Sequence, residues 1–442
     1  MSRLFLVFLV LCSIGNYGVQ SSASSPEIFD RNKLFKTNQK DTATHVYRES
    51  IRRLESRTDI VKVQEMPSNY THELVFAIQQ LNMDKLLLVL EDISDPTSEN
   101  YGNHMSAASV AALTANPTAA SAAIAYLNEN GATVVSESLY GEYVTAVAPV
   151  AVWNKVLKTK FFAFQQTQID GSIEKLVRSE HYHVPIELDE HILCVMNTIQ
   201  MPLRTSSVKR IPYTPQAVSK IDLANSHFES QGAPTGYIYP DLLRRFYKAE
   251  NAFGSSVATQ AVFGGNEDCF SPRSLRFFQR NLTREAEQPA LTIDDDFVTD
   301  DYRCDSGEGN LDIQYIISMA RGSPTTWWHR SGGLAGWLVE VANTPTPPLV
   351  LSISYGADEL SVSRFEFELF DQQAQKLGVR GTTVLVASGD DGVHSSRARS
   401  SAAYCGYNPD FPAGSPYVVA VGATSVSHIN ITTHSTRQCD TH

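Results

Sequence analysis

Apolar residues follow a helix-like spacing in the first part of the chain. Leu74, Ile78 and Leu81 recur at this spacing within HELVFAIQQLNMDKLLLVLEDISDP, and Asp95-Pro96 interrupts the pattern. The spacing predicts helix up to Asp95. Two Ala-rich segments, SAASVAALTANP and TAASAAIAYLNENG, predict short helices, whereas ATVVSES and YVTAVAPV predict strands. Residues 45–205 are therefore predicted to form a small α+β domain.

Apolar residues form nearly continuous runs in the second part of the chain, residues 237–442. The runs ATQAVFGG, PLVLSISYG, TTVLVASGDDG and PYVVAVGATS each predict a strand, and SRFEFELFDQQAQKLG predicts a helix that stops at Gly378. Apolar strands that alternate with helices predict an α/β domain with a parallel sheet and helices on both faces. Such sheets bind ligands beyond the carboxyl ends of their strands, where ISYG and ASGDDG lie.

A polar segment with scattered Pro and Gly, residues 206–236, separates the two parts and predicts a linker. It contains the basic pair Lys209-Arg210. This pair agrees equally well with a processing site and with an ordinary surface position.

The first 21 residues have the pattern of a secretory signal peptide. One early Arg precedes a short apolar run, and small residues follow before a predicted cleavage after Ser21. Asn-x-Ser/Thr sequences agree with passage through a glycosylating pathway, and they begin at Asn69, Asn281 and Asn430. We expect a secreted or lysosomal/vacuolar protein.

Composition narrows the class of protein. The 442-residue chain is 42% hydrophobic, which is enough to bury a large core in two or three domains. Its net charge of -12, without a run rich in Lys or Arg, argues against a nucleic-acid partner. No apolar stretch after the signal is long enough to cross a bilayer, so no membrane partner is expected.

Cysteine usage agrees with an oxidising compartment. Loss of Cys12 with the signal leaves an odd number of cysteines, which predicts a free thiol, an intermolecular bond or an unmatched partner. Cys269 and Cys304 could pair locally, and the partners of Cys405 and Cys439 stay open. No CxxC spacing or His cluster indicates a zinc site.

Two acids four residues apart are the first candidate for chemistry. Glu308 and Asp312 in SGEGNLDIQYI would share one face of a helix, where they must either face water or share a proton. Acids in an exposed first turn are the general expectation, because they favour the helix dipole. The apolar residues Ile313, Ile316 and Ile317 indicate burial nearby.

Several motifs in order along the chain resemble the sedolisins, which are serine-carboxyl peptidases of subtilisin-like fold, and most closely their tripeptidyl-peptidase members. The segment VFAIQQLNMDKLLLVLEDISDPTSENYGNHMSAASVAALT is similar to the start of the family's propeptide domain. GEGNLDIQYI matches the helix with the family's Glu and Asp, and SISYG, ASGDDG and FPAGSPYVVAVGATS match later landmarks. The resemblance implies an acid-acting peptidase zymogen with peptide or protein substrates and its own propeptide as inhibitor and chaperone.

The resemblance also implies roles for individual residues. Glu308 would take the proton from a catalytic serine, and Asp312 would hold and polarise Glu308. Asp390 in SGDDG would be the protonated donor to the developing oxyanion. The segment formed by Ser354, Tyr355 and Gly356 would contact the substrate.

The chain departs from the family pattern at three points. Ala357 replaces the first of two aspartates found in tripeptidyl-peptidases, which leaves tripeptidyl-peptidase and endopeptidase action both open. The nucleophile motif Ser-Gly-Thr-Ser does not occur in the 442 residues, and neither does the family's C-terminal calcium site. We therefore expect a C-terminally truncated, inactive chain with an incomplete sheet and no metal site, with calcium as a cofactor that only the family implies.

Three other classes of protein stay open. The triplet Asp305-Ser306-Gly307 occurs in aspartic peptidases, although DDYRC precedes it here instead of an apolar strand. The acidic run Asp294–Asp301 could bind a hard cation or be a solvated loop. The absent serine motif favours a non-catalytic peptidase relative that acts by binding or inhibition. His394 has no Gly-x-Ser-x-Gly partner motif and is expected to be a surface histidine.

Overall fold

The computed structural model describes residues 44–51, 59–167, 173–202, 238, 240–265, 268–283, 286–293, 304, 307–330, 333–394, 398 and 405–423. The predicted signal peptide, most of the linker region and the acidic run 294–301 lie outside these residues, as do Asn430 and Cys439. The described residues lie within one compact unit, Gln39–His442. In this unit we call residues 44–202 the N-terminal half and residues 238–423 the C-terminal half.

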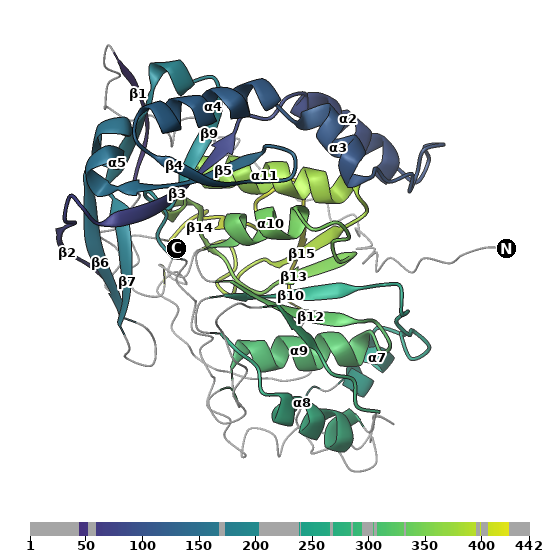
Figure 1. Cartoon of the computed structure of the whole chain (residues 1–442). Coiled ribbons are helices and arrows are strands. Elements are labelled where there is room, and N and C mark those ends of the chain that lie inside the picture. The colour runs from purple at the N-terminus through teal and green to yellow at the C-terminus, as the bar shows by residue number, and fades with distance from the viewer. Residues whose placement is uncertain are drawn as a thin grey trace, which may run out of the picture. The chain divides into compact units, whose positions relative to one another are not determined.

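Antiparallel sheets and short helices make up the N-terminal half (Figure 1). A four-stranded sheet has the order β4 (Thr133–Glu137), β5 (Tyr143–Pro149), β3 (Thr71–Ile78) and β9 (Ile192–Met196). A three-stranded sheet contains β2 (Ile60–Glu65), β6 (Phe161–Thr167) and β7 (Ile173–Ser179), and β1 (His45–Ser50) pairs with β8 (His181–Pro185). The helices are α2 (Met83–Ser94), α3 (Ala107–Thr114), α4 (Pro117–Glu129), α5 (Val150–Val156) and the 3-10 turn η2 (Ile186–Leu188).

The prediction of helix from Leu74 onward is wrong for its first part. Residues Thr71–Ile78 form strand β3, and helix begins only at Met83. Leu74, Phe76 and Ile78 are fully buried, which is the two-residue period of a strand with one face against a core. Leu74 and Ile78 lie four positions apart, and this spacing places two side chains on the same side of a helix and also on the same side of a strand. The predicted end of the helix at Asp95 is confirmed, as are α3, α4, β4 and β5.

A six-stranded parallel sheet forms the centre of the C-terminal half (Figure 1). Its order is β11 (Leu291–Ile293), β12 (Thr325–Arg330), β10 (Gln260–Gly265), β13 (Val350–Ile353), β15 (Thr383–Ala387) and β17 (Val419–Val421). The helices are α7 (Pro240–Phe246), α8 (Pro272–Phe278), the π-helical η4 (Gln279–Thr283), α9 (Glu308–Met319), α10 (Leu334–Ala342), η5 (Glu359–Ser361) and α11 (Arg364–Val379). A short antiparallel pair joins β14 (Ala357–Asp358) to β16 (Asp410–Phe411). The predicted parallel sheet is confirmed.

Helices cover both faces of this sheet, as the sequence predicts. Ala261 and Phe263 of β10 pack in a cluster with Trp337 of α10 and Phe370 of α11. Val262, which points to the other face, packs with Leu275 of α8 and with Ile313 and Ile317 of α9. Figure 1 shows α10 and α11 on one side of the sheet and α9 on the other. Strand β10 is therefore buried on both faces, which explains its continuous apolar sequence.

The predicted stop of helix α11 at Gly378 lies one residue before the observed end. Helix α11 continues through Gly378 to Val379, and its C-cap is Arg380. Gly381, with a φ of 90°, ends the helix in the left-handed conformation that glycine favours. A glycine follows the end of the helix, as the sequence predicts, but it is Gly381 and not Gly378.

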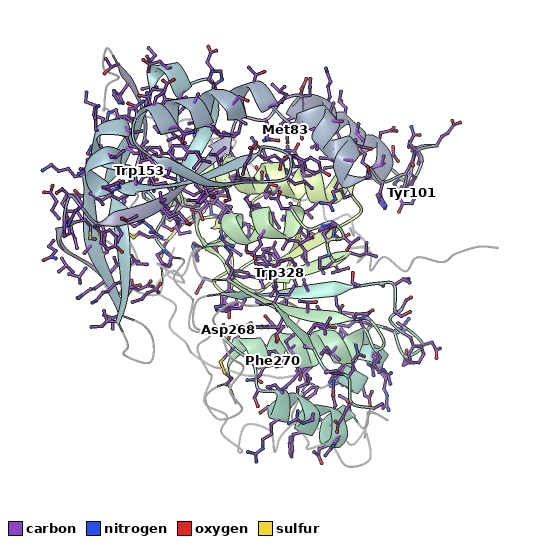
Figure 2. The ribbon with its side chains drawn as sticks, viewed as in Figure 1. Met83, Tyr101, Trp153, Asp268, Phe270 and Trp328 are labelled. Carbon is purple, nitrogen blue, oxygen red and sulfur yellow. A yellow bond between two sulfur atoms is a disulfide. The ribbon has the colours of Figure 1, made fainter. Side chains whose placement is uncertain are left out.

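One face of the four-stranded sheet packs on the C-terminal half. Ala77 of β3, Tyr143 of β5 and Cys194 of β9 belong to the same buried cluster as α10 and α11. The other face encloses a separate core that contains Trp153, whereas Trp328 lies in the cluster shared by both halves (Figure 2). The two halves therefore form a continuous apolar interface within one compact unit.

Cysteine pairing agrees with what the sequence allowed. Cys269 and Cys304 form a disulfide, as the sequence allowed, and Cys194 is a buried free thiol. Cys405 is also disulfide-bonded. No single helix of the described ranges has the length and apolar character of a membrane span, although the bent pair α3 and α4 passes that test jointly.

Candidate functional site

The site lies where the strand order of the parallel sheet reverses. β10 is followed along the chain by β11 and β12 on one side, and β13, β15 and β17 then lie on the other side. In such sheets the usual place for ligands is beyond the carboxyl ends of the strands at this reversal, which are β10 and β13 here. Asp268 follows β10, Ser354 and Tyr355 follow β13, and Asp390 follows β15.

Helix α9 presents the two predicted carboxyl groups at this edge. Glu308 is its first residue, and Asp312 lies one turn later on the same face. Gly309 lies between them against the Cys269 carbonyl oxygen, which would be only 2.5 Å from a Cβ atom at this position. A side chain there would push α9 away, so the glycine lets the helix approach the end of β10.

Asp312 is partly buried on α9, and its surroundings disfavour its charged form. Its Oδ1 accepts a hydrogen bond from the Ser354 hydroxyl at 3.0 Å, and its Oδ2 is buried without a hydrogen-bond partner among the described residues. Burial, and then the charge of Glu308, raise the pKa of Asp312 to about 8, although the Ser354 hydrogen bond opposes the shift. The interpretation of these acids as an exposed first turn does not hold for Asp312.

Glu308 lies half-buried among other acids. Burial raises the pKa of Glu308 above its usual value, and the charges of Asp268 and Asp390 add to the shift. Asp390 is exposed in the loop after β15 and is close enough to Glu308 to act on it electrostatically. The structure thus brings together Glu308, Asp312 and Asp390, the three acids that the sequence singled out.

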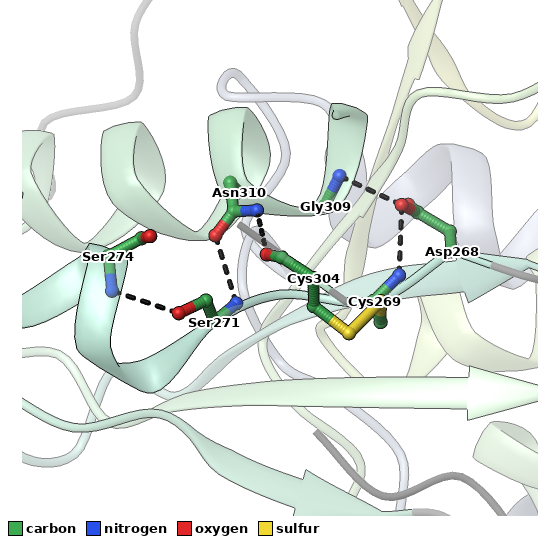
Figure 3. The surroundings of a disulfide bond; sticks show 7 residues. All are labelled: Asp268, Cys269, Ser271, Ser274, Cys304, Gly309 and Asn310. Carbon is green, nitrogen blue, oxygen red and sulfur yellow. Dashed lines mark hydrogen bonds between the residues drawn. A yellow bond between two sulfur atoms is a disulfide. The ribbon is translucent and has the colours of Figure 1, made fainter. Parts of the chain in front are cut away.

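Asp268 is a fourth acid that sequence reasoning missed. Its carboxylate accepts hydrogen bonds from the backbone N–H groups of Cys269 and Gly309, each at 3.0 Å (Figure 3). The Tyr355 hydroxyl also donates to Asp268. Burial raises the pKa of Asp268 in spite of these three hydrogen bonds. The available signal was its position three residues after a strand that ends in Gly-Gly, at the edge where such sheets usually bind ligands.

The disulfide fixes the loop that carries Asp268. Cys269 is bonded to Cys304, and the Asn310 amide donates to the Cys304 carbonyl oxygen while its carbonyl oxygen accepts from the Ser271 N–H at 2.9 Å (Figure 3). Asn310 belongs to the first turn of α9. These contacts hold the loop after β10 against the helix end that carries Glu308.

The Ser-Tyr-Gly segment supports the carboxyl groups directly. Ser354 donates to Asp312, Tyr355 donates to Asp268, and a Cβ atom at Gly356 would lie 2.8 Å from the Phe411 carbonyl oxygen. The side chains of Ser354 and Tyr355 therefore point to the acids, and contact with a substrate stays a prediction for the backbone of this segment.

Asp410 is a further acid without a sequence signal. It lies on β16, and its carboxylate occupies the space where Gly389 would carry a Cβ atom. Burial raises the pKa of Asp410 to about 7, and the charges of Asp358, Asp391, Glu359 and Asp390 add to the shift. Its place beside the loop of Asp390 depends on the pairing of β14 with β16, which the sequence does not reveal.

The described residues contain no group of three or more His, Cys, Asp or Glu side chains that could hold a metal ion. Asp312 and Asp268 accept hydrogen bonds from hydroxyl and backbone N–H groups. Calcium stays an expectation that only the family resemblance implies.

Comparisons with known proteins found one family model and several similar proteins. The family model "Pro-kumamolisin, activation domain" matches residues 58–201. Physarolisin of Physarum polycephalum is 28% identical over 386 residues, which cover 81% of this chain and 61% of physarolisin. Tripeptidyl-peptidase 1 of Homo sapiens is 28% identical over 370 residues, which cover 80% of this chain and 61% of that protein. The chain thus spans about three fifths of the length of these relatives.

Tripeptidyl-peptidase 1 of Dictyostelium discoideum is 26% identical over 380 residues, which cover 79% of this chain and 61% of that protein. Among solved structures, Pseudomonas sedolisin complexed with two molecules of pseudo-iodotyrostatin matches 41% of this chain and 53% of its own chain. Its identity is 22% and its TM-score is 0.33.

Proposed function

We propose that this sedolisin-family protein, similar to tripeptidyl-peptidase 1, is the zymogen of a serine-carboxyl peptidase that hydrolyses peptide bonds at acidic pH. Its N-terminal half, which matches the activation-domain model, would be the propeptide, and its C-terminal half would carry the catalytic acids. Residues 206–236 would be the linker that is cut on activation. The signal sequence and an exposed Asn69 support secretion or delivery to a lysosome or vacuole.

The observation that carries the proposal is the placement of Asp312, which lies one turn from Glu308 on α9, accepts a hydrogen bond from Ser354 and has its Oδ2 atom buried. Because burial and the neighbouring acids raise the pKa of Asp312 to about 8, one carboxyl group of the pair is neutral while Glu308 can ionise. A neutral Asp312 can donate from Oδ2 and orient Glu308, which then takes the proton of a serine nucleophile. A histidine base would be charged at acidic pH, whereas a carboxylate still accepts a proton there.

Asp390 would complete the site as the donor to the oxyanion. It lies at the carboxyl end of β15, within electrostatic reach of Glu308, and its loop packs on Asp410. Protonated Asp390 would donate a hydrogen bond to the oxygen on which negative charge develops. The backbone of Ser354, Tyr355 and Gly356 would align the substrate at the end of β13.

The proposal assigns no residue of this chain as the nucleophile. Ser-Gly-Thr-Ser does not occur in the 442 residues, and Ser354 is already bonded to Asp312. We propose that these residues alone do not hydrolyse peptides. The experiment therefore compares the 442-residue chain with the longest product of its gene.

Peptide hydrolysis at about pH 4, near the usual carboxyl pKa, tests the function. The longest gene product should cleave a mixed peptide library, and Glu308→Gln and Asp390→Asn should each lower kcat by about 10²–10³-fold or more, the usual loss for an oxyanion donor. The neutral variant of an exposed acid, Asp84→Asn, is the matched control. Near-normal turnover in Glu308→Gln or Asp390→Asn would break the assignment. Product lengths would separate tripeptide release from internal cleavage, and inhibition by pepstatin would favour an aspartic peptidase.

A further inference from the structure

Three histidines lie together on the two-stranded sheet of β1 and β8. Tyr47 is paired with His183, Ser50 with His181, and His45 with Pro185. Alternate residues of a strand point to one side, so these three histidines and Tyr47 share a face. The His183 ring lies 5.7 Å from the His181 ring and 5.4 Å from the Tyr47 ring, measured between centroids.

His183 is the histidine of this cluster whose protonation the fold opposes. Its side chain is buried, and its Nδ1 has no hydrogen-bond partner within the described part of the chain. Burial lowers the pKa of His183, and the neighbouring His181, Lys158 and His45 lower it further, although a hydrogen bond with the Lys158 backbone opposes the shift. The groups that face His183 are thus His45 and Tyr47 from β1, His181 from β8, and Lys158 after α5.

Strand β1 connects this cluster to the C-terminal half. Among the described strands β1 pairs only with β8. The Glu49 carboxylate accepts a hydrogen bond at 2.7 Å from the backbone N–H of Arg364, the first residue of α11. The Arg48 guanidinium lies 2.9 Å from the Asp189 carboxylate and 5.7 Å from the centroid of the Phe365 ring.

The contact with Glu49 matters for the start of α11. The first N–H groups of a helix have no partner within the helix. Glu49 satisfies the N–H of Arg364, while the Ser363 hydroxyl accepts from the N–H of Glu366 at 3.0 Å. Strand β1 therefore caps α11 from the N-terminal half. We call residues 45–50 the latch.

We propose that His183 makes this latch acid-labile: when its ring gains a proton, the new buried charge beside His45, His181 and Lys158 separates β1 from β8 and frees the N-terminus of α11. The direction of the pH effect follows from the linkage between proton binding and folding stability. A histidine with a lowered pKa contributes stability above its unfolded value of ~6.5, and this stability is lost as the pH falls below that value and through the lowered pKa of His183. The latch is a property of the fold, and only its meaning as a first step of zymogen activation rests on the proposed function.

A second group near the latch responds to acid with the opposite sign. Glu366 is buried near Glu49, and burial, followed by the charge of Glu49, raises the pKa of Glu366 to about 7. Protonation of Glu366 removes repulsion between the two carboxylates, so this contact becomes more favourable in acid. A test must therefore change His183 itself and not only the pH.

Hydrogen exchange of the 442-residue chain, followed by mass spectrometry at about pH 7.5 and about pH 5.0, tests the latch on either side of the usual histidine pKa. Exchange times are corrected for the intrinsic effect of pH. We expect peptides that cover β1 to lose protection at least ~10-fold at the lower pH, which is ~1.4 kcal/mol. In His183→Gln, which has no titratable ring, the peptides that cover β1 should keep their protection at the lower pH. His191→Gln is the control variant, and peptides from α4 are the internal reference.

Equal loss of protection in wild type and His183→Gln, or no loss in wild type, would overturn the proposal. So would simultaneous loss in β1 and α4, because that is global unfolding. If His183→Gln does not fold at about pH 7.5, hydrogen exchange of the wild-type chain over a series of pH values decides whether a histidine or a carboxylate controls the latch. Loss of β1 protection between about pH 6.5 and pH 5 supports a histidine, and loss only below about pH 4.5 assigns it to carboxylates and contradicts the latch. None of these outcomes depends on peptidase activity.

Discussion

Ser354, directly after β13, donates a hydrogen bond to the Oδ1 atom of Asp312 on α9. The other oxygen of Asp312 is buried without a partner in the described part of the chain. A buried carboxylate in this position would leave a charge uncompensated, whereas a carboxylic acid can donate from Oδ2 to a neighbouring acid. The geometry therefore favours a proton on Asp312.

Asp312→Asn should stabilise the protein at neutral pH. A carboxyl group whose pKa is raised to about 8 disfavours folding increasingly as the pH rises from the unfolded value of ~3.9 towards 8. The amide resembles the protonated acid and still accepts from Ser354, so the penalty disappears. We expect Tm at about pH 7.5 to rise by at least ~3 °C, and little change at about pH 4.

Thermal unfolding followed by circular dichroism measures this effect. Asp84→Asn, a change at an exposed acid of α2, is the control and should shift Tm by less than ~1 °C. A lower Tm for Asp312→Asn at both pH values would mean that Asp312 is ionised in the folded protein.

Tyr355→Phe should destabilise the fold because it removes one of three hydrogen bonds to buried Asp268. Loss of a donor to a buried carboxylate costs ~1–3 kcal/mol. The loss should be largest at high pH, where Asp268 is ionised. Urea unfolding at about pH 8 and about pH 4.5 checks this expectation, with Tyr101→Phe at an exposed position as the control. A cost for Tyr355→Phe that is the same at both pH values would contradict the role of the hydroxyl in supporting a charge.

Glu142→Gln should weaken the interface between the two halves. Lys376 of α11 forms an ion pair with Glu142 and donates to the Gln80 side chain at 2.7 Å, and both ionisable side chains are buried. A buried ammonium group without its partner costs ~3–5 kcal/mol, whereas replacement of both partners by apolar groups is often neutral. The double variant Lys376→Met with Glu142→Leu should therefore recover much of the loss.

Alkylation of Cys194 reports on this interface directly. This free thiol is buried in the apolar cluster shared by β9, α10 and α11, and burial raises its pKa. Glu142→Gln should accelerate its reaction with iodoacetamide, and the double variant should react nearly as slowly as wild type. Equal alkylation rates in all three proteins would show that Lys376 and Glu142 do not hold the halves together.

Acid treatment should cut the chain between residues 206 and 236. The change in composition there and the match of residues 58–201 to an activation domain place the expected boundary in this segment. Incubation of the longest gene product at about pH 4, followed by N-terminal sequencing, should give a new N-terminus in this range. Activity without such a cut would contradict the zymogen proposal.

The sequence predicted most of the sheet but not all of the site. Strands such as β10 are buried on both faces, so their apolar runs are unambiguous, and Glu308 and Asp312 were found because helical spacing is local. Leu74 and Ile78 satisfied helical and strand periods alike, and only burial against Trp153 decides between them. Asp268 and Asp410 reach the site through strand pairings between distant segments, which no local pattern encodes.

Covalent labelling by a fluorophosphonate probe at about pH 4 tests the central claim most directly. The probe reacts with a serine only when a base activates its hydroxyl. We predict that the longest gene product is labelled on one serine, and that Glu308→Gln loses this labelling while Asp84→Asn retains it. Absence of labelling in the wild-type protein, or equal labelling in Glu308→Gln, would contradict the assignment of Glu308 as the base of a serine-carboxyl peptidase, and the first result would favour a non-catalytic relative.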